Sequence, residues 1–202
     1  MSKIAWNPGT LLAPVPPTLV SCGTLAAPAV LTVAWAGTLN TKPPRTYNSV
    51  RPTRHSYPIL KETGEFVINL PPASLVRAVD LCGCKTGATA DKFALAGLTA
   101  APASKVAAPL IDDCPLCLEC RVFDTVLLGS HEMFLADIVA VDVDEKLVDD
   151  AGRLHLDRAG LLAYAHGEYF ALGDKVGSFG FSVRKKPKKP HGPRLGPAPE
   201  KR

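Results

Sequence analysis

The stretch CLECRVFDTVLLGSHEMFLADIVAVDVDE, residues 117–145, decides the fold class. Its two halves, 117–129 and 131–145, are long and rich in β-branched and aromatic residues, and a Gly-Ser pair separates them. This pattern predicts two long antiparallel strands joined by a short turn, which is a β-hairpin. We therefore expect a mainly β protein.

Shorter β-rich segments flank this hairpin on both sides. We expect strands at 18–24, 29–39, 46–50 and 65–70, and two more within 161–172 around Gly167, with 177–182 closing the folded part. Short helices are predicted at 54–64, ended by Gly64, at 72–83, and at 89–97, capped by Thr89. Many strands without a regular βαβ alternation favour a closed β-barrel with short helical insertions.

Length and composition indicate one ordinary folded domain. The chain has 202 residues, of which 47% are hydrophobic and 21% charged. No apolar run approaches the roughly 20 residues that a membrane-spanning helix needs, so we expect no membrane partner. The start, MSKIAWNPGTLLAPVPP, lacks the basic residues and unbroken apolar stretch of a secretory signal. The sequence therefore predicts a cytoplasmic protein.

The positive charge is concentrated at the C-terminal end. Residues 183–202 contain eight of the 23 Lys and Arg residues and one Glu, which leaves 15 basic and 18 acidic residues elsewhere. We predict a folded domain at 1–183 and a basic, Pro-rich, disordered tail at 184–202. Nucleic-acid binding by the tail is the alternative, but the acidic body offers no basic face to support it, so we expect no nucleic-acid partner.

Five of the six cysteines are closely spaced. Cys114, Cys117 and Cys120 follow one another at intervals of three, and Cys82 precedes Cys84 by two. Such spacing also occurs in zinc and iron–sulfur sites. On a strand, however, residues three apart point to opposite faces, so Cys117 and Cys120 would diverge. We favour free thiols and predict no metal site, with a metal site or a disulfide as alternatives.

The turn SVRPTRHS, residues 49–56, gathers cations and hydroxyl groups where a strand ends and a helix begins. Free N–H groups at a helix start attract anions, and planar guanidinium groups fit phosphate oxygens. The polar side chains of the turn are those of Ser49, Arg51, Thr53, Arg54, His55 and Ser56. The alternative is an ordinary solvated turn in which one arginine pairs with a carboxylate such as Glu62.

A second basic turn, CGCKTG at 82–87, raises the odds of a phosphate site. It carries Lys85 and Thr86 between glycines, whose backbone permits close approach of an anion, and Lys92 follows in the next predicted helix. Two such turns suit a ligand with one phosphate better than an extended polyanion. The sequence contains neither a Walker motif nor Gly-x-Gly-x-x-Gly, which disfavours nucleoside triphosphates and a Rossmann domain.

Seven segments, in this order, resemble the flavin reductase-like proteins that bind FMN in a split β-barrel, and the flavoredoxin branch in particular. They cover about residues 10–183 and read TVAWAGTLN, YNSVRPTRHSYPILKETGEFVINLP, CGCKTG, DKFALAGLT, APLIDDCP, LGSHEMFLADIVAVDVDE and GRLHLDRAGLLAYAHGEYFALG. The resemblance implies a homodimer in which each barrel holds one FMN near the subunit interface.

The resemblance also assigns cofactor-binding residues. The two basic turns would hold the FMN phosphate and ribityl chain through Ser49, Val50, Arg51, His55, Ser56, Cys82, Gly83, Lys85, Thr86 and Lys92. The segment Ala34, Trp35, Ala36, Gly37 and Thr38 would run beneath the flavin ring and bond its pyrimidine edge. Trp35 is either a ring contact or a core residue. The open face of the ring would be bordered by His131, Tyr164, His166 and Phe170, as substrate-binding residues.

The implied function is a flavin or ferric reductase. NADH or NADPH would pass a hydride to FMN, and a flavin, a ferric compound or a protein would accept the electrons, with no acid, base or nucleophile required from the chain. One alternative is a flavoredoxin-type electron carrier that a protein partner reduces. Another alternative is a non-catalytic FMN- or metal-binding module.

Overall fold

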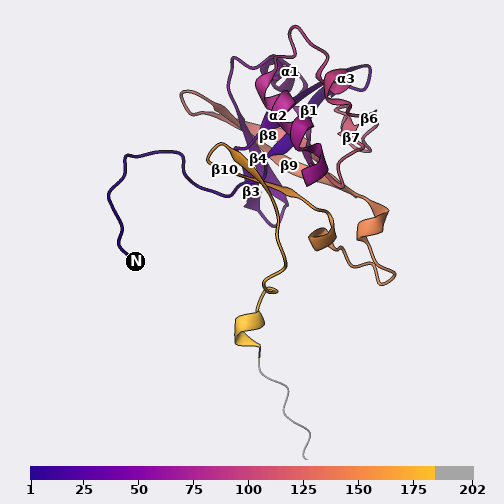
Figure 1. Cartoon of the computed structure of the whole chain (residues 1–202). Helices are drawn as coiled ribbons and strands as arrows, with labels where there is room; N and C mark the ends of the chain where they lie inside the picture. Colours follow the sequence, from indigo (N-terminus) through magenta and orange to yellow (C-terminus); the bar gives the residue numbers. More distant parts are fainter. Residues whose placement is uncertain (185–202) are drawn as a thin grey trace, which may run out of the picture. The chain divides into compact units, whose positions relative to one another are not determined.

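A computed structural model describes residues 1–184 of the chain (Figure 1). Met1–Leu172 form one compact unit that contains all of the strands described below, and Gly173–Arg202 form a second unit. Within the second unit, the described part contains one 3₁₀ turn, η4 (Phe181–Val183), and Phe179 and Phe181 are exposed there. The boundary predicted at residue 183 stays a prediction, and the tail predicted at 184–202 lies, apart from Arg184, outside the described residues.

A seven-stranded antiparallel sheet forms the body in the order β2-β1-β5-β8-β9-β4-β3. The strands are β1 (Thr18–Thr24), β2 (Ala27–Val33), β3 (Ala36–Asn40), β4 (Arg45–Val50), β5 (Glu65–Leu70), β8 (Leu116–Leu127) and β9 (Glu132–Val143). The long β8–β9 hairpin at the centre confirms the prediction made from residues 117–145.

The predicted single strand at 29–39 is wrong, because the chain bends at Ala34 and Trp35. The part before the bend, β2, pairs with β1, and the part after it, β3, pairs with β4 at the other end of the sheet. The backbone N–H of Ser49 donates to the carbonyl of Trp35 at 2.9 Å, so the bend is also tied to β4. One chain segment thus joins both ends of the sheet and closes it into a barrel.

Apolar side chains from all seven strands meet in one cluster, which we call the barrel core. Its members are Val20, Cys22, Leu31, Val33, Ala36, Val50, Phe66, Ile68, Cys120, Phe134 and Ala136, with Leu60 from helix α1 (Ser56–Thr63). A second cluster, the helix-side core, contains Leu19, Val67 and Cys117. Because Cys117 and Cys120 lie in different clusters, the predicted divergence of these two side chains is confirmed.

Short helices cover β1 and β2 (Figure 1). Helix α1 ends at Gly64, which has a left-handed φ of 64°, as the sequence predicted. The second predicted helix is a 3₁₀ turn, η1 (Ala73–Leu75), followed by α2 (Val76–Cys84). The third is α3 (Lys92–Ala96), and its cap is Asp91, whose side chain accepts from Ala94 N. The prediction that Thr89 caps this helix is therefore wrong.

Smaller elements complete the body. They are β6 (Ala100–Ala101), β7 (Leu110–Ile111), η2 (Glu145–Leu147), η3 (Leu156–Arg158), β10 (Leu162–Ala165) and β11 (Glu168–Ala171). Strands β10 and β11 form the short hairpin predicted around Gly167. Among residues 1–184, the helices are all too short or too polar to cross a bilayer.

Candidate functional site

The two basic turns lie together and line one cavity of about 310 Å³. The first turn follows β4 and leads into α1, and the second follows α2. Nη1 of Arg54 donates to the carbonyl of Gly83 at 3.1 Å and so ties the first turn to the second. The lining residues are Leu31, Arg51, Thr53, Arg54, His55, Ser56, Lys85, Thr86, Gly87 and Lys92. We call this space the phosphate cavity.

Lys92 places a buried ammonium group in the wall of the phosphate cavity. The residue is only 8% exposed, and its Nζ donates to the carbonyl of Cys82 at 2.9 Å. Burial lowers the pKa of Lys92, and the nearby Arg54 charge lowers it further, although the Cys82 thiol acts in the opposite direction. A bound anion would oppose this shift, because it favours the charged amine.

Gly87 allows the second turn to lie against the imidazole of His55. A Cβ atom at position 87 would come within 2.7 Å of His55 Cδ2, which is closer than side chains pack. A side chain at position 87 would therefore displace the His55 ring, so glycine allows the two basic turns to pack closely.

A buried carboxylate fixes α1 to the central hairpin. Glu132, at the start of β9, is 2% exposed and accepts from Lys61 Nζ at 2.7 Å and from the hydroxyl of Tyr57. These two hydrogen bonds lower the pKa of Glu132. The clamp holds the helix whose first residue is Ser56. Local sequence patterns could not predict this clamp, because Glu132 lies more than 70 residues away from Tyr57 and Lys61 along the chain.

The alternative of an arginine paired with Glu62 is not what the structure shows. Among residues 1–184, the ion pairs involve neither Arg51 nor Arg54. Arg51 is exposed, and the guanidinium of Arg54 bonds only to a carbonyl among the hydrogen bonds found. The charge of Arg51 is therefore available to an anion.

His131 lies beside the first turn. It precedes Glu132, which is paired with Val50 across the sheet, so His131 is opposite the start of the turn at Arg51. Partial burial lowers the pKa of His131, and the charges of Arg51 and Arg54 lower it further. A neutral imidazole therefore borders the cations of the phosphate cavity.

The remaining predicted cofactor residues support the cavity without lining it. Val50 and Ala36 are buried in the barrel core, and Cys82 is buried in the helix-side core. Ser49 is 9% exposed. The segment from Ala34 to Thr38 runs through the bend and into β3, where the carbonyl of Gly37 accepts from the Thr46 hydroxyl at 2.9 Å.

The sequence analysis did not single out Asn48, which is a buried polar residue of β4. Asn48 is 0% exposed, and neither its Nδ2 nor its Oδ1 has a hydrogen-bond partner among the described protein atoms. It is paired with Ala36 across the sheet, immediately after the bend at Trp35. Buried amides normally find partners, so the unpaired amide of Asn48 is unfavourable for folding.

The other predicted substrate-binding residues lie on the β10–β11 hairpin and do not line the phosphate cavity. The rings of Tyr164 and Tyr169 are 5.4 Å apart, and the hydroxyl of Tyr169 donates to Asp80 of α2 at 3.4 Å. His166 lies in the hairpin turn with a φ of 49°, and Phe170 is 48% exposed. A role for Tyr164, His166 and Phe170 stays a prediction.

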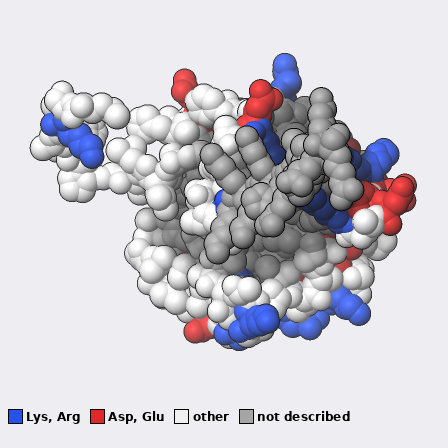
Figure 2. Space-filling view, turned by 90° about the horizontal axis from the view of Figure 1, so that it is seen from below, with Lys and Arg blue, Asp and Glu red and all other residues white. Residues whose placement is uncertain are grey.

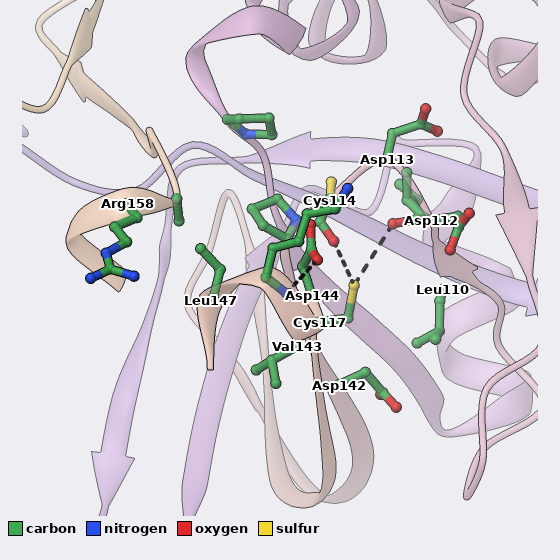
Figure 3. Close-up of a pocket in the computed structure, with 15 residues that line it drawn as sticks. Leu110, Asp112, Asp113, Cys114, Cys117, Asp142, Val143, Asp144, Leu147 and Arg158 are labelled. Carbon is green, nitrogen blue, oxygen red and sulfur yellow. Dashed lines mark hydrogen bonds between the residues drawn. The ribbon is translucent and has the colours of Figure 1, made fainter. Parts of the chain in front are cut away.

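Figure 3 shows another cavity, of about 640 Å³, which the sequence did not indicate. Cys114 and Cys117 line it, and the thiol of Cys117 donates to the carbonyls of Ile111 and Cys114 at 3.8 Å each. Burial, together with nearby carboxylates such as Asp142, raises the pKa of Cys117 to about 12. Burial also raises the pKa of Cys114. Both thiols are therefore protonated near neutral pH, which makes them poor nucleophiles.

Comparison with known proteins identifies the fold of this barrel. Residues 11–173 match the model of the flavin reductase like domain. The chain belongs to the flavin reductase-like family. This membership confirms the resemblance found from the seven sequence segments, and it confirms the predicted split-barrel fold.

Two solved structures are similar to this chain along most of its length. The flavoredoxin of Desulfovibrio vulgaris (Miyazaki F) is 29% identical, with a TM-score of 0.84, over 91% of this chain and 100% of that one. A flavoredoxin from Methanosarcina acetivorans is 25% identical, with a TM-score of 0.82 and the same coverage.

Two proteins are similar to this chain in sequence. A protein of Archaeoglobus fulgidus is 33% identical over 114 residues, which are 56% of this chain and 64% of that protein, just under two thirds of its length. A protein of Pyrococcus abyssi is 28% identical over 82% of this chain and 95% of that protein.

Proposed function

We propose that the chain is an FMN-binding oxidoreductase that takes a hydride from NADH or NADPH and passes electrons to a flavin, a ferric compound or a protein. The phosphate cavity is the observation that carries this proposal. Four cationic side chains, those of Arg51, Arg54, Lys85 and Lys92, border a space of about 310 Å³ at the start of α1. This is the chemistry that a phosphate monoester requires.

The residues present fit FMN. Lys92 is a buried cation without a carboxylate partner among residues 1–184, so an anion in the cavity would satisfy it. Gly87 lets the second turn pack against His55 of the first turn, which keeps the two basic turns together. FMN, when bound, supplies the hydride-accepting ring, so the chain itself has only to bind, orient and shield.

The bend at Ala34 and Trp35 is the proposed support of the flavin ring. It is hydrogen-bonded to Ser49, two residues before Arg51, so the ring support and the phosphate turn share one strand. We propose that backbone groups from Ala34 to Thr38 contact the ring. His131, neutral and next to Arg51, would border the approach of the nicotinamide.

A homodimer is part of the proposal. The second half of β8 exposes apolar side chains, including Phe123, at 43%, and Leu127, at 73%. A second copy would cover such a surface. Light scattering of the purified protein checks the dimer; a monomer at micromolar concentration would contradict it.

The absence of a nucleic-acid partner and the cytoplasmic location stay predictions. On the face shown in Figure 2, Lys and Arg side chains of the described residues lie mostly along the margin, with Asp and Glu near some of them.

The test begins with the absorption spectrum of the protein as purified, because bound FMN gives a yellow band. Anaerobic mixing of the flavin-loaded protein with NADH and with NADPH then follows. Rapid bleaching with either nucleotide supports the reductase. Bleaching by a reduced protein donor but not by pyridine nucleotides identifies a carrier, which the two flavoredoxin structures favour as second candidate. Colourless protein that takes up no FMN, and retains zinc or iron, would refute both and favour a binding module.

A further inference from the structure

The loop between β6 and β7 is held by a buried carboxylate of the sheet. Glu119 of β8 is 0% exposed, and it accepts four hydrogen bonds from residues 104–106. Its Oε1 accepts from the backbone N–H and the hydroxyl of Ser104 at 2.8 Å each. Its Oε2 accepts from the N–H groups of Lys105 at 2.6 Å and Val106 at 3.1 Å. We call residues 104–106 the latched loop.

Asp142 of β9 lies beside Glu119 on the same face of the sheet. It is paired with Cys117, and Glu119 is two residues farther along β8, so the two carboxyl groups are diagonal neighbours. Oδ2 of Asp142 is buried without a hydrogen-bond partner among the atoms of residues 1–184. If both groups were ionised, they would repel each other, and Oδ2 would lose its hydration without gaining a donor.

One proton held by the two carboxyl groups removes both penalties. The four donors of the latched loop favour the ionised form of Glu119, so the proton belongs on Asp142, which can donate it to Glu119. Burial and the charge of Glu119 raise the pKa of Asp142. Burial also acts to raise the pKa of Glu119, but hydrogen bonds from the latched loop and from Asp142 outweigh it and lower that pKa.

We propose that Glu119 and Asp142 form a proton-sharing pair that acts as a pH-sensitive latch for residues 104–106. While the pair holds one proton, Glu119 accepts the donors of the loop and Asp142 donates to Glu119. As the pH rises, the proton passes to solvent, the two negative charges repel, and the latched loop loosens. Val106 packs with Phe93 of α3 in the helix-side core, so this loosening also weakens the packing around α3.

The two carboxyl groups define the pH window of the latch. Because the pKa of Asp142 is raised, its contribution to stability is complete below the ordinary value of 3.8 and is lost as the pH rises through the raised value. Because the pKa of Glu119 is lowered, its contribution is complete above the ordinary value of 4.5 and is lost as the pH falls through the lowered value. The latched loop is therefore held between the lowered and the raised value.

Other charged and titratable groups face the pair. Arg121 of β8 donates to the carbonyl of Lys105 at 2.8 Å and forms an ion pair with Glu65 of β5. The cavity of Figure 3 brings further charges to Asp142, those of Asp112, Asp113, Asp144, Lys146 and Arg158. Burial raises the pKa of the two thiols in that cavity, to about 12 for Cys117, so both keep their protons below pH ~9.

Hydrogen exchange of the full chain measures the latch through the amides of Ser104, Lys105 and Val106. After correction for the intrinsic pH dependence of exchange, their protection in the wild type is expected to fall at least about tenfold between pH ~4 and pH ~9. The amides of β5, which is paired on both sides, are the internal reference. They should keep their protection, which separates local release of the loop from global unfolding.

Asp142→Asn makes the test specific. The amide has nearly the size of the carboxyl group, and its N–H donates to Glu119 at every pH, so protection of the latched loop should stay within about twofold over the same range. Asp112→Asn is the matched control, because Asp112 is an exposed carboxylate that lines the same cavity. It should show the same loss of protection as the wild type.

Two results would overturn the latch. One is constant protection of the loop in the wild type, and the other is an equal loss of protection in the wild type and in Asp142→Asn. Carbon-13 NMR of the side-chain carboxyl groups tests the wild type even if Asp142→Asn does not fold. The Asp142 resonance should titrate with a midpoint above 3.8, and the Glu119 resonance should respond at the same midpoint. An Asp142 midpoint at or below 3.8 would also refute the shared proton.

Discussion

Replacing Arg51 by Ala tests the phosphate cavity most directly. Arg51 is exposed and forms no ion pair within residues 1–184, so its loss should change the free energy of unfolding by less than about 0.5 kcal/mol. A hydrogen bond between charged groups contributes about 1.5–3 kcal/mol. Because solvent reaches Arg51 and screens its charge, the lower half of that range applies, which corresponds to roughly 10- to 40-fold weaker FMN binding.

Riboflavin provides the internal comparison, since it has the same ring and sugar chain but no phosphate. Its dissociation constant should be unchanged in Arg51→Ala, whereas that of FMN rises. The difference in FMN affinity between wild type and variant should shrink as KCl is raised from about 0.05 to 0.5 M, because salt screens the attraction between Arg51 and the phosphate in the wild type. Isothermal titration calorimetry or flavin fluorescence measures all of these constants.

The matched control is Arg77→Ala, which removes the same charge from an exposed position of α2 that does not line the phosphate cavity. It should leave FMN affinity within about twofold of the wild type. The reasoning would be refuted if Arg51→Ala weakened riboflavin as much as FMN, or if Arg77→Ala had the same effect as Arg51→Ala.

Three further predictions concern Lys92, Gly87 and Asn48. Burial lowers the pKa of Lys92 below 10.5, so FMN affinity should fall as the pH rises through that lowered pKa. Over the same pH range, the free energy of unfolding of the flavin-free protein should rise, because the buried amine loses its charge. Lys92→Met should abolish both pH dependences in titrations between pH 7 and 10. Gly87→Ala should weaken FMN binding about tenfold, because the new methyl group pushes His55 aside. Adding His55→Ala to this variant should restore part of the FMN affinity. If the two substitutions instead lower the FMN affinity additively, the contact between residues 55 and 87 is irrelevant to binding. Asn48→Val should raise the free energy of unfolding of the flavin-free protein by about 1–3 kcal/mol in urea denaturation, since it removes two unpaired buried polar atoms; a loss of stability would mean that Asn48 has a partner.

Local patterns predicted the elements whose structure depends on neighbours in the chain. The central hairpin follows from its composition, the end of α1 follows from Gly64, and the opposite orientations of Cys117 and Cys120 follow from strand geometry. The bend at Ala34 and Trp35 could not be predicted in this way. Nothing in the composition of 29–39 breaks a strand there, and the bend exists because its two halves pair with strands at opposite ends of the sheet.

The candidate site also combines features that local sequence patterns predict with features that depend on the tertiary fold. The cations of each basic turn are visible in the sequence, and the resemblance to flavin reductase-like proteins supplied their common purpose. That Arg54 bonds to Gly83, some 30 residues away, is a product of the tertiary fold. Thr89 and Asp91 are both capping residues, but the helix begins at Lys92, directly after Asp91, which is also the better cap of the two. Glu132 and Asn48 carried no sequence signal, because an isolated polar residue in a strand is indistinguishable from a solvent-facing one.

The arrangement of the phosphate cavity also implies that cofactor and fold are thermodynamically linked. Helix α1 is fixed by the Glu132 clamp, and the second turn is fixed by Arg54, so both walls exist before any anion arrives. Within those walls Lys92 is charged, desolvated and bonded to a single carbonyl, which is an unfavourable state for a lone cation. An anion that binds there removes this penalty in the folded state only, because the unfolded chain has no such cavity. Phosphate-bearing flavins should therefore stabilise the protein against unfolding by more than riboflavin does at equal fractional saturation, and the excess measures what the buried amine costs the empty barrel.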